Sequence, residues 1–187
     1  MASGESVRFG RNKLIEEFQG KTFIQHILDK TEGLFAKRVV VTRSKEVEEI
    51  CKAQAVEVIY HSCPNRNDTV RIGIGQMKNM DGCLFCPCDQ VLLSKNTLKK
   101  MSEIMVKEED IFRLAYEENP GTPILFGKKY FKELAELPKK AGGSYLTKKY
   151  PENVQYVMAE YAQELWDIDT EEDLKKINAE YTRTLVN

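Results

Sequence analysis

The first fourteen residues, MASGESVRFGRNKL, combine a loop of small residues with two cationic side chains. Gly4 lets the backbone approach a ligand closely, and the successive amides from Ser3 to Ser6 can form a concave anion-binding site. Arg8 offers a planar fork for phosphate oxygens, and Lys13 offers a compact positive charge. The loop lacks the G-K-[ST] of a Walker motif, so it predicts another kind of phosphate site. The alternative interpretation is a polar, mobile N-terminus.

Three aspartates can complete such a site. Asp89 directly follows an apolar stretch, and Asp167 and Asp169 alternate in the segment WDIDT. Carboxylate oxygens suit Mg²⁺, which in proteins shares its other positions with water and substrate phosphates. Alternate residues of an extended segment share a side, so one or both of Asp167 and Asp169 can join Asp89. The alternatives are turn or helix-capping aspartates, but Thr170 already supplies a cap, which favours a metal site.

Three of the five cysteines crowd together in GCLFCPCD, a spacing that invites a zinc or iron–sulfur interpretation. The stretch is predicted to be a buried strand, so Cys83 points away from Cys86 and Cys88, and no second cluster completes a tetrahedral site. Small buried thiols are the favoured interpretation. The odd number excludes a complete disulfide framework, and no pairing of the two histidines with a serine or cysteine indicates nucleophilic catalysis.

Strand and helix patterns alternate along the chain and predict one α/β domain over residues 1–187 with a mainly parallel sheet. The predicted strands are 38–44, 56–60, 81–89, 111–117 and 153–161, with 122–126 a loop or short strand. The predicted helices are 22–32 (with Gly33 past its end), 45–54, 67–79, one after Ser94, 128–140, and one after Thr170. Ligands of such sheets bind beyond the carboxyl ends of the strands, which directs attention to the first loop, Asp89 and the 167–169 segment.

Composition excludes several classes of protein. The chain has 187 residues, 28 Lys+Arg and 29 Asp+Glu, and this balance argues against a nucleic-acid binder that relies on bulk positive charge. No apolar run is long enough for a membrane span, and the first residues lack the basic stretch and apolar core typical of a signal peptide. We therefore expect a cytoplasmic protein with reduced thiols.

Several stretches together resemble the MobA-like nucleotidyltransferases, most closely the molybdenum cofactor cytidylyltransferases. The opening residues match the family pattern L-A-A-G-x-S-x-R-F-G-x-N-K-L at nine positions that include Gly4, Arg8 and Lys13. The segments GKTFIQHILDK, FCPCDQVLL, GTPILF and DIDTEEDL follow in the family's order. The matches run from residue 1 to about 175.

The resemblance implies a three-layer sandwich like that of nucleotide-diphospho-sugar transferases, a Rossmann-like fold. It implies transfer of a nucleoside monophosphate, with CTP preferred and GTP possible, to a molybdopterin-type acceptor, and it leaves room for a molybdoenzyme partner. It also implies three sets of site residues: a nucleotide loop of Ala2, Ser3, Gly4, Ser6, Arg8 and Lys13; a base-binding region of Asn65, Thr69 and Gly73; and Mg²⁺ ligands Asp89, Asp167 and Asp169.

Two departures from the family pattern carry expectations of their own. A full strand usually precedes the first motif, so we expect a central strand of only one or two residues here. The family's G-D-x-G appears as Lys139-Lys140-Ala141-Gly142, which loses an acidic residue near the acceptor. The alternatives are therefore a sugar- or polyol-phosphate acceptor, or a non-catalytic nucleotide-binding protein of the same fold.

Overall fold

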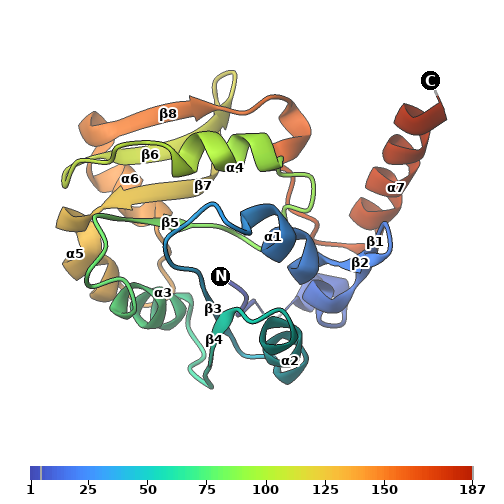
Figure 1. Ribbon diagram of the computed structural model, residues 1–187, viewed down its shortest axis with the longest axis horizontal. Coiled ribbons are helices and arrows are strands. Elements are labelled where there is room, and N and C mark those ends of the chain that lie inside the picture. The colour runs from blue at the N-terminus through green and yellow to red at the C-terminus, as the bar shows by residue number, and fades with distance from the viewer. Residues whose placement is uncertain (5, 187) are drawn as a thin grey trace.

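The computed structural model describes residues 1–4 and 6–186 (Figure 1). Several of its helices form where apolar residues recur at helical spacing and a capping side chain directly precedes the first helical residue. Thr22, Ser44 and Ser94 each accept a hydrogen bond from a first-turn amide of α1, α2 and α4. The helices are α1 (Phe23–Thr31), α2 (Lys45–Ala53), α3 (Arg66–Gly75), α4 (Lys95–Ser102), α5 (Phe131–Ala135), α6 (Ser144–Lys149) and α7 (Glu171–Val186).

The strands form two main sheets and a small hairpin. β5 (Gly82–Phe85), β6 (Ile111–Tyr116), β7 (Asn119–Gly127) and β8 (Val154–Met158) make a sheet of order β5-β7-β6-β8. β3 (Val39–Thr42) and β4 (Glu57–Tyr60) pair parallel to each other, and β1 (Glu17–Phe18) with β2 (Lys21–Thr22) forms the hairpin. β7 runs antiparallel to both its neighbours, whereas β6 and β8 are parallel, so the sheet is mixed.

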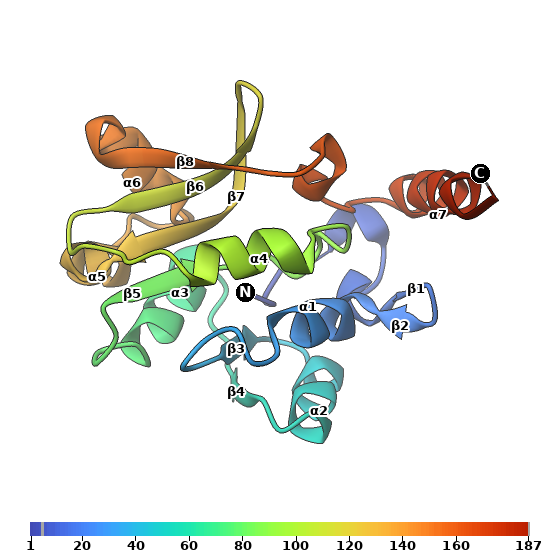
Figure 2. The same cartoon turned by 45° about the horizontal axis from the view of Figure 1, so that its top comes forward.

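Helices cover both faces of the four-stranded sheet, which gives the three predicted layers. On one face Phe85 and Phe126 pack with side chains of α3, α5 and α6. On the other face Leu125 packs with Leu98 and Met101 of α4. Figures 1 and 2 show α4 and α3 on opposite sides of β5. The predicted three-layer α/β architecture is confirmed.

Some predicted elements differ from the observed ones for local reasons. Residues 122–126 belong to the nine-residue strand β7, which forms an antiparallel pair with β6. The predicted helix 128–140 is a 3₁₀ turn followed by α5, which ends at Ala135, shortly before Pro138. The six-residue helix α6 is too short for its periodicity to identify it in the sequence.

The expected short central strand is present as a single bridge. Ala2 pairs parallel with Thr42, and its amide donates to Val41 O at 3.0 Å. The Met1 amine donates to Cys86 O at 2.7 Å, so residues 1 and 2 lie between β3 and the segment after β5. The N-terminus accordingly appears between these strands in Figure 2. Beside it lies an apolar cavity of about 400 Å³, lined from both sides by Val39–Val41 and Gly82–Phe85.

The cysteine cluster separates into different parts of the core. Cys83 packs with β7 and α5, Cys86 contacts the α4 side of the sheet, and Cys88 packs with α1 and α2. All five thiols are free. Within residues 1–4 and 6–186, no group of three or more His, Cys, Asp or Glu side chains is arranged to hold a metal. None of the helices in these residues has the length and apolar character that a membrane crossing requires.

Candidate active site

The first loop folds back on itself around Ser6. Its backbone has a φ of 49°, and its carbonyl accepts hydrogen bonds from the amides of Phe9 and Gly10. Gly10 adopts a φ of 78°, a conformation that glycine reaches without the steric cost of a side chain. The Ser6 hydroxyl accepts from the Lys13 amide at 3.3 Å. These contacts reverse the direction of the chain, so that Lys13 lies beside Ser6.

Asn12 fixes the direction in which Lys13 leaves the loop. Its side-chain oxygen accepts from the Leu14 amide and caps the 3₁₀ turn Lys13–Ile15, while its amide nitrogen donates to Ser44 Oγ at 2.9 Å. The turn is therefore tied to the start of α2. Sequence reasoning does not place Asn12 in the site, although its position directly before Lys13 in the motif signals this role.

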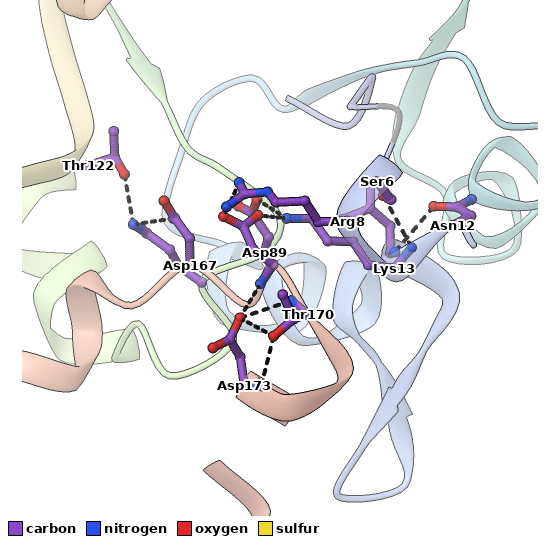
Figure 3. Close-up of polar contacts among 12 residues, drawn as sticks. Ser6, Arg8, Asn12, Lys13, Asp89, Thr122, Asp167, Thr170 and Asp173 are labelled. Carbon is purple, nitrogen blue, oxygen red and sulfur yellow. Dashed lines mark hydrogen bonds and ion pairs between the residues drawn. The ribbon is translucent and has the colours of Figure 1, made fainter. Parts of the chain in front are cut away.

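Lys13 lies between two of the predicted carboxylates (Figure 3). Its ammonium is 2.7 Å from a carboxylate oxygen of Asp89 and 2.7 Å from one of Asp169. Only 9% of the Lys13 side chain is exposed, and burial alone would lower its pKa; the two carboxylates outweigh this, so the pKa is raised. Arg8, on the solvent side, forms a second ion pair with Asp169. Residues far apart in sequence thus form one cluster of two cations and two anions.

Backbone contacts hold the two carboxylates together. Asp89 lies four residues beyond the end of β5, and its carbonyl accepts from the Ile168 amide at 3.1 Å. Asp173 Oδ2 accepts from the amides of Asp169 and Thr170 and from the Thr170 hydroxyl, at 2.8 to 3.1 Å. Hydrogen bonding by Thr170 lowers the pKa of Asp173. The start of α7 therefore positions Asp169 opposite Asp89, a role that the T-x-x-D spacing signals.

Asp167 has a different set of contacts from Asp169. Gln90 Nε2 donates to Asp167 Oδ1 at 3.0 Å and to Thr122 Oγ1 at 2.8 Å. Burial, and then the nearby charge of Asp89, raises the pKa of Asp167. Asp167 binds Gln90, which also contacts Thr122 of β7, whereas Asp169 binds Lys13. The three predicted carboxylates therefore do not form one metal cluster among the described residues. Gln90 was missed, although it directly follows Asp89.

The predicted base-binding residues are tied to the first loop through a histidine. The Ser3 hydroxyl donates to Val41 O at 3.0 Å, so its 2.9 Å contact with His61 Nε2 requires the imidazole to donate. Thr69 Oγ1 lies 3.4 Å from the same nitrogen. Burial, followed by the charge of Arg43, lowers the pKa of His61, which favours the neutral ring. The sequence alone does not indicate this role for His61, because its partners Ser3 and Thr69 belong to other segments of the chain.

The other two residues of this group have structural contacts. Asn65 precedes α3, and its side-chain amide donates to Asp68 at 3.3 Å. Gly73 lies on the face of α3 that meets β3, where a Cβ would sit 3.5 Å from a Val41 methyl carbon, and it lines the apolar cavity. Thr69 lines the same cavity.

A depression of about 450 Å³ adjoins the loop and is the geometric counterpart of the predicted phosphate site. It is lined by the predicted residues Ala2, Ser3, Gly4 and Ser6, and also by Gly10, Asn12, Arg43 and Ser44. Arg43 and Ser44 directly follow the end of β3. Because ligands of such sheets bind beyond the ends of strands, this position is the sequence signal for both residues.

The carboxylate pair has the chemistry that a divalent cation needs. Asp89 and Asp169 each direct an oxygen at one ammonium, and their side chains remain 24% and 28% exposed. Hard cations such as Mg²⁺ and Mn²⁺ take oxygen ligands, and one or two carboxylates with substrate phosphates and water suffice for Mg²⁺. The two aspartates therefore fit such an ion.

The layered fold and the cation–carboxylate cluster at the ends of its strands define an α/β protein of the nucleotide-diphospho-sugar transferase fold. A nucleotidyl transferase from Methanothermobacter superposes with a TM-score of 0.84 at 21% identity, covering 98% of this chain and 95% of that one. The sequence profile described as MobA-like NTP transferase domain matches residues 1–154. The chain belongs to this family.

Two further proteins show the range of the similarity. A probable molybdenum cofactor guanylyltransferase of Bacillus cereus is 30% identical over 116 residues, which are 59% of this chain and 56% of that protein. The chain spans 31% to 56% of the lengths of the curated relatives it matches. A Mycobacterium tuberculosis protein crystallised as a complex with manganese has a TM-score of 0.72 at 18% identity, with 95% and 94% of the two chains covered.

Proposed function

We propose that the protein is a divalent-metal-dependent nucleotidyltransferase that moves a nucleoside monophosphate from a nucleoside triphosphate to a phosphorylated acceptor. The observation that carries the proposal is the position of Lys13 between Asp89 and Asp169, at the base of a small-residue loop. In this proposal the cations contact phosphate and the carboxylates hold a metal, and their proximity supports that assignment. Membership in the MobA-like NTP transferase domain family supports it.

In this proposal the loop residues Ala2, Ser3, Gly4 and Ser6 hold the nucleotide, and Arg8 and Lys13 contact its triphosphate. A terminal phosphate oxygen of the acceptor forms a bond to the α-phosphorus. The bond from that phosphorus to the bridging oxygen breaks, and its electron pair leaves with pyrophosphate. Because the attacking oxygen is already anionic, the site needs little general-base help, and positioning with charge neutralisation supplies the catalysis.

Asp89 and Asp169 would hold the metal, Mg²⁺ in our prediction, and the ion supplies neutralisation of the phosphate charge when bound. The manganese complex of the mycobacterial structure supports divalent metal use in proteins of this fold. Asp167 is assigned to this region as a neighbour of Asp89 that Gln90 holds in place. The base would approach the Ser3–His61–Thr69 contacts, with Asn65 and Gly73 farther along α3.

The relatives' names bear on the substrates. They are called molybdenum cofactor guanylyltransferases, which supports a molybdopterin-type acceptor and gives GTP priority over the CTP that the opening motif favoured. The molybdoenzyme partner, the cytoplasmic location and the single domain over 1–187 stay predictions.

The test is calorimetric titration of the four nucleoside triphosphates with Mg²⁺, followed by pyrophosphate release with molybdopterin as acceptor. We expect one nucleotide to bind, and Asp89→Ala to abolish turnover. Asp81→Ala is the matched control, because Asp81 is an exposed aspartate at the other end of β5. Loss of the Lys13 cation is expected to cost about 3 kcal/mol in kcat/KM. Equal nucleotide affinity and equal turnover in wild type and Asp89→Ala would contradict the proposal.

A further inference from the structure

The carboxylate pair proposed for the metal is already fully compensated by charge. Lys13 contacts both aspartates at 2.7 Å, and Arg8 pairs with Asp169. Two positive side chains therefore face two negative ones. Figure 3 shows the Arg8 and Lys13 side chains extending from the first loop toward Asp89.

Lys13 is held in this position more firmly than an ordinary surface lysine. Its side chain is 9% exposed, and its backbone is fixed by the Asn12 cap and by Ser6 Oγ. Arg8, by contrast, is 73% exposed at its side chain. A nearly buried ammonium in contact with two carboxylates occupies the place where a metal would find its protein oxygens.

A divalent ion arriving alone would have to share these oxygens with Lys13 or displace it. Sharing places like charges together, and displacement leaves a nearly buried ammonium without its partners, which is costly. A triphosphate changes this balance, because its oxygens give Lys13 and Arg8 new anionic partners and give the metal further ligands. The depression that adjoins the loop lies next to this cluster through Ser6, Gly10 and Asn12.

We propose that Lys13 occupies the carboxylate pair of the nucleotide-free protein as a substitute cation, so that the divalent metal enters only together with nucleotide phosphates. The inference rests on the proposed function, because it assigns the metal to Asp89 and Asp169. It adds an order of binding and names the residue that imposes it.

The experiment measures Mn²⁺ binding directly by electron paramagnetic resonance, without nucleotide, in wild type and Lys13→Met. Lys21→Met is the matched control, because Lys21 also pairs with an aspartate, Asp29, but on the exposed surface of α1. We expect Lys13→Met to bind Mn²⁺ about tenfold more tightly than wild type or Lys21→Met, a value reduced by solvent screening at the partly exposed site. Lys13→Arg keeps the charge and should bind as weakly as wild type.

Thermal unfolding gives a second measurement that does not depend on full stability of the variant. Mn²⁺ alone should raise the melting temperature of Lys13→Met more than that of wild type, because the variant lacks the ammonium that contacts Asp89 and Asp169. Equal Mn²⁺ affinity in wild type and Lys13→Met overturns the inference. If wild type still releases pyrophosphate in that case, the proposed function stands; absence of both turnover and Mn²⁺ binding in every protein rejects both.

Discussion

The substitution Glu164→Gln tests whether one buried carboxylate holds the segment that carries the site aspartates. Glu164 is fully buried and lies three residues before Asp167. Its oxygens accept from the Ser94 amide at 2.9 Å, the Glu160 amide at 2.8 Å and the Thr97 hydroxyl at 3.1 Å. It therefore joins the start of α4 to the turn that leads into the 167–169 segment.

The expected cost follows from these three contacts. A glutamine keeps the size but replaces one acceptor oxygen by an NH₂ group, which must face a backbone N–H or the Thr97 donor. One charge-assisted hydrogen bond is worth about 1.5–3 kcal/mol, and a buried donor left without an acceptor costs about 1–3 kcal/mol. Because such terms are not additive, we expect a loss of about 3 kcal/mol, or about 6–12 °C in melting temperature for a chain of this size.

Urea unfolding and differential scanning calorimetry measure the change. Glu160→Gln is the control, since Glu160 contacts Ser94, Asn96 and Lys100 on the exposed side of the same helix start and should cost under about 0.5 kcal/mol. Pyrophosphate release should fall with Glu164→Gln under conditions where it remains folded. A stability within about 1 kcal/mol of wild type would refute the argument that this carboxylate connects α4 to the site.

Three further predictions follow from buried groups and one glycine. Burial lowers the pKa of Lys30 to about 8 from an ordinary 10.5. As the pH rises, Lys30 therefore loses its proton in the folded protein before it does in the unfolded chain, so the free energy of unfolding rises with pH between those two values. Urea titrations at pH 7.5 and 10 should show wild type gaining about 2 kcal/mol relative to Lys30→Met, and an unchanged difference would contradict it. Burial raises the pKa of Cys83 and of Cys86 to about 12, so a thiol reagent at pH 8 should label Cys63 first, and a fast phase that survives Cys63→Ser would show otherwise. Gly73→Ala should stabilise α3 by about 1 kcal/mol in thermal unfolding, because the new methyl group finds ordinary contact distance to Val41; a loss of nucleotide binding instead would place Gly73 in the base site.

The sequence could predict that Lys13 and Asp89 lie close together, because both belong to segments next to the ends of strands. Lys13 belongs to a recognisable loop, and Asp89 follows a run of apolar residues; parallel strands then bring their ends to one edge. The partnership of Asp167 with Gln90 could not be predicted, since a two-residue alternation fixes which side chains share a side but not which neighbours lie there. The role of His61 depends on hydrogen-bond partners from two other elements, which spacing alone does not reveal.

The antiparallel course of β7 was also beyond the sequence pattern. Residues 119–127 are apolar in their second half, which is typical of a buried strand in either direction. The direction follows instead from the two-residue connection to β6, Glu117–Glu118, with Glu117 at a φ of 52°. Both residues of this turn are glutamates, so the turn itself lacks the glycine or asparagine that typically marks a hairpin in a sequence.

Residues 1 and 2 link two separate sheets, through the Ala2–Thr42 bridge on one side and the Met1 hydrogen bond to Cys86 on the other. β3 and β4 form one of these sheets, and β5, β7, β6 and β8 form the other. The Lys13–Asp89 ion pair is a further link, because Lys13 is anchored to the start of α2 and Asp89 follows β5. A ligand that binds both residues would hold the two sheets together, so its binding would also raise the free energy of unfolding.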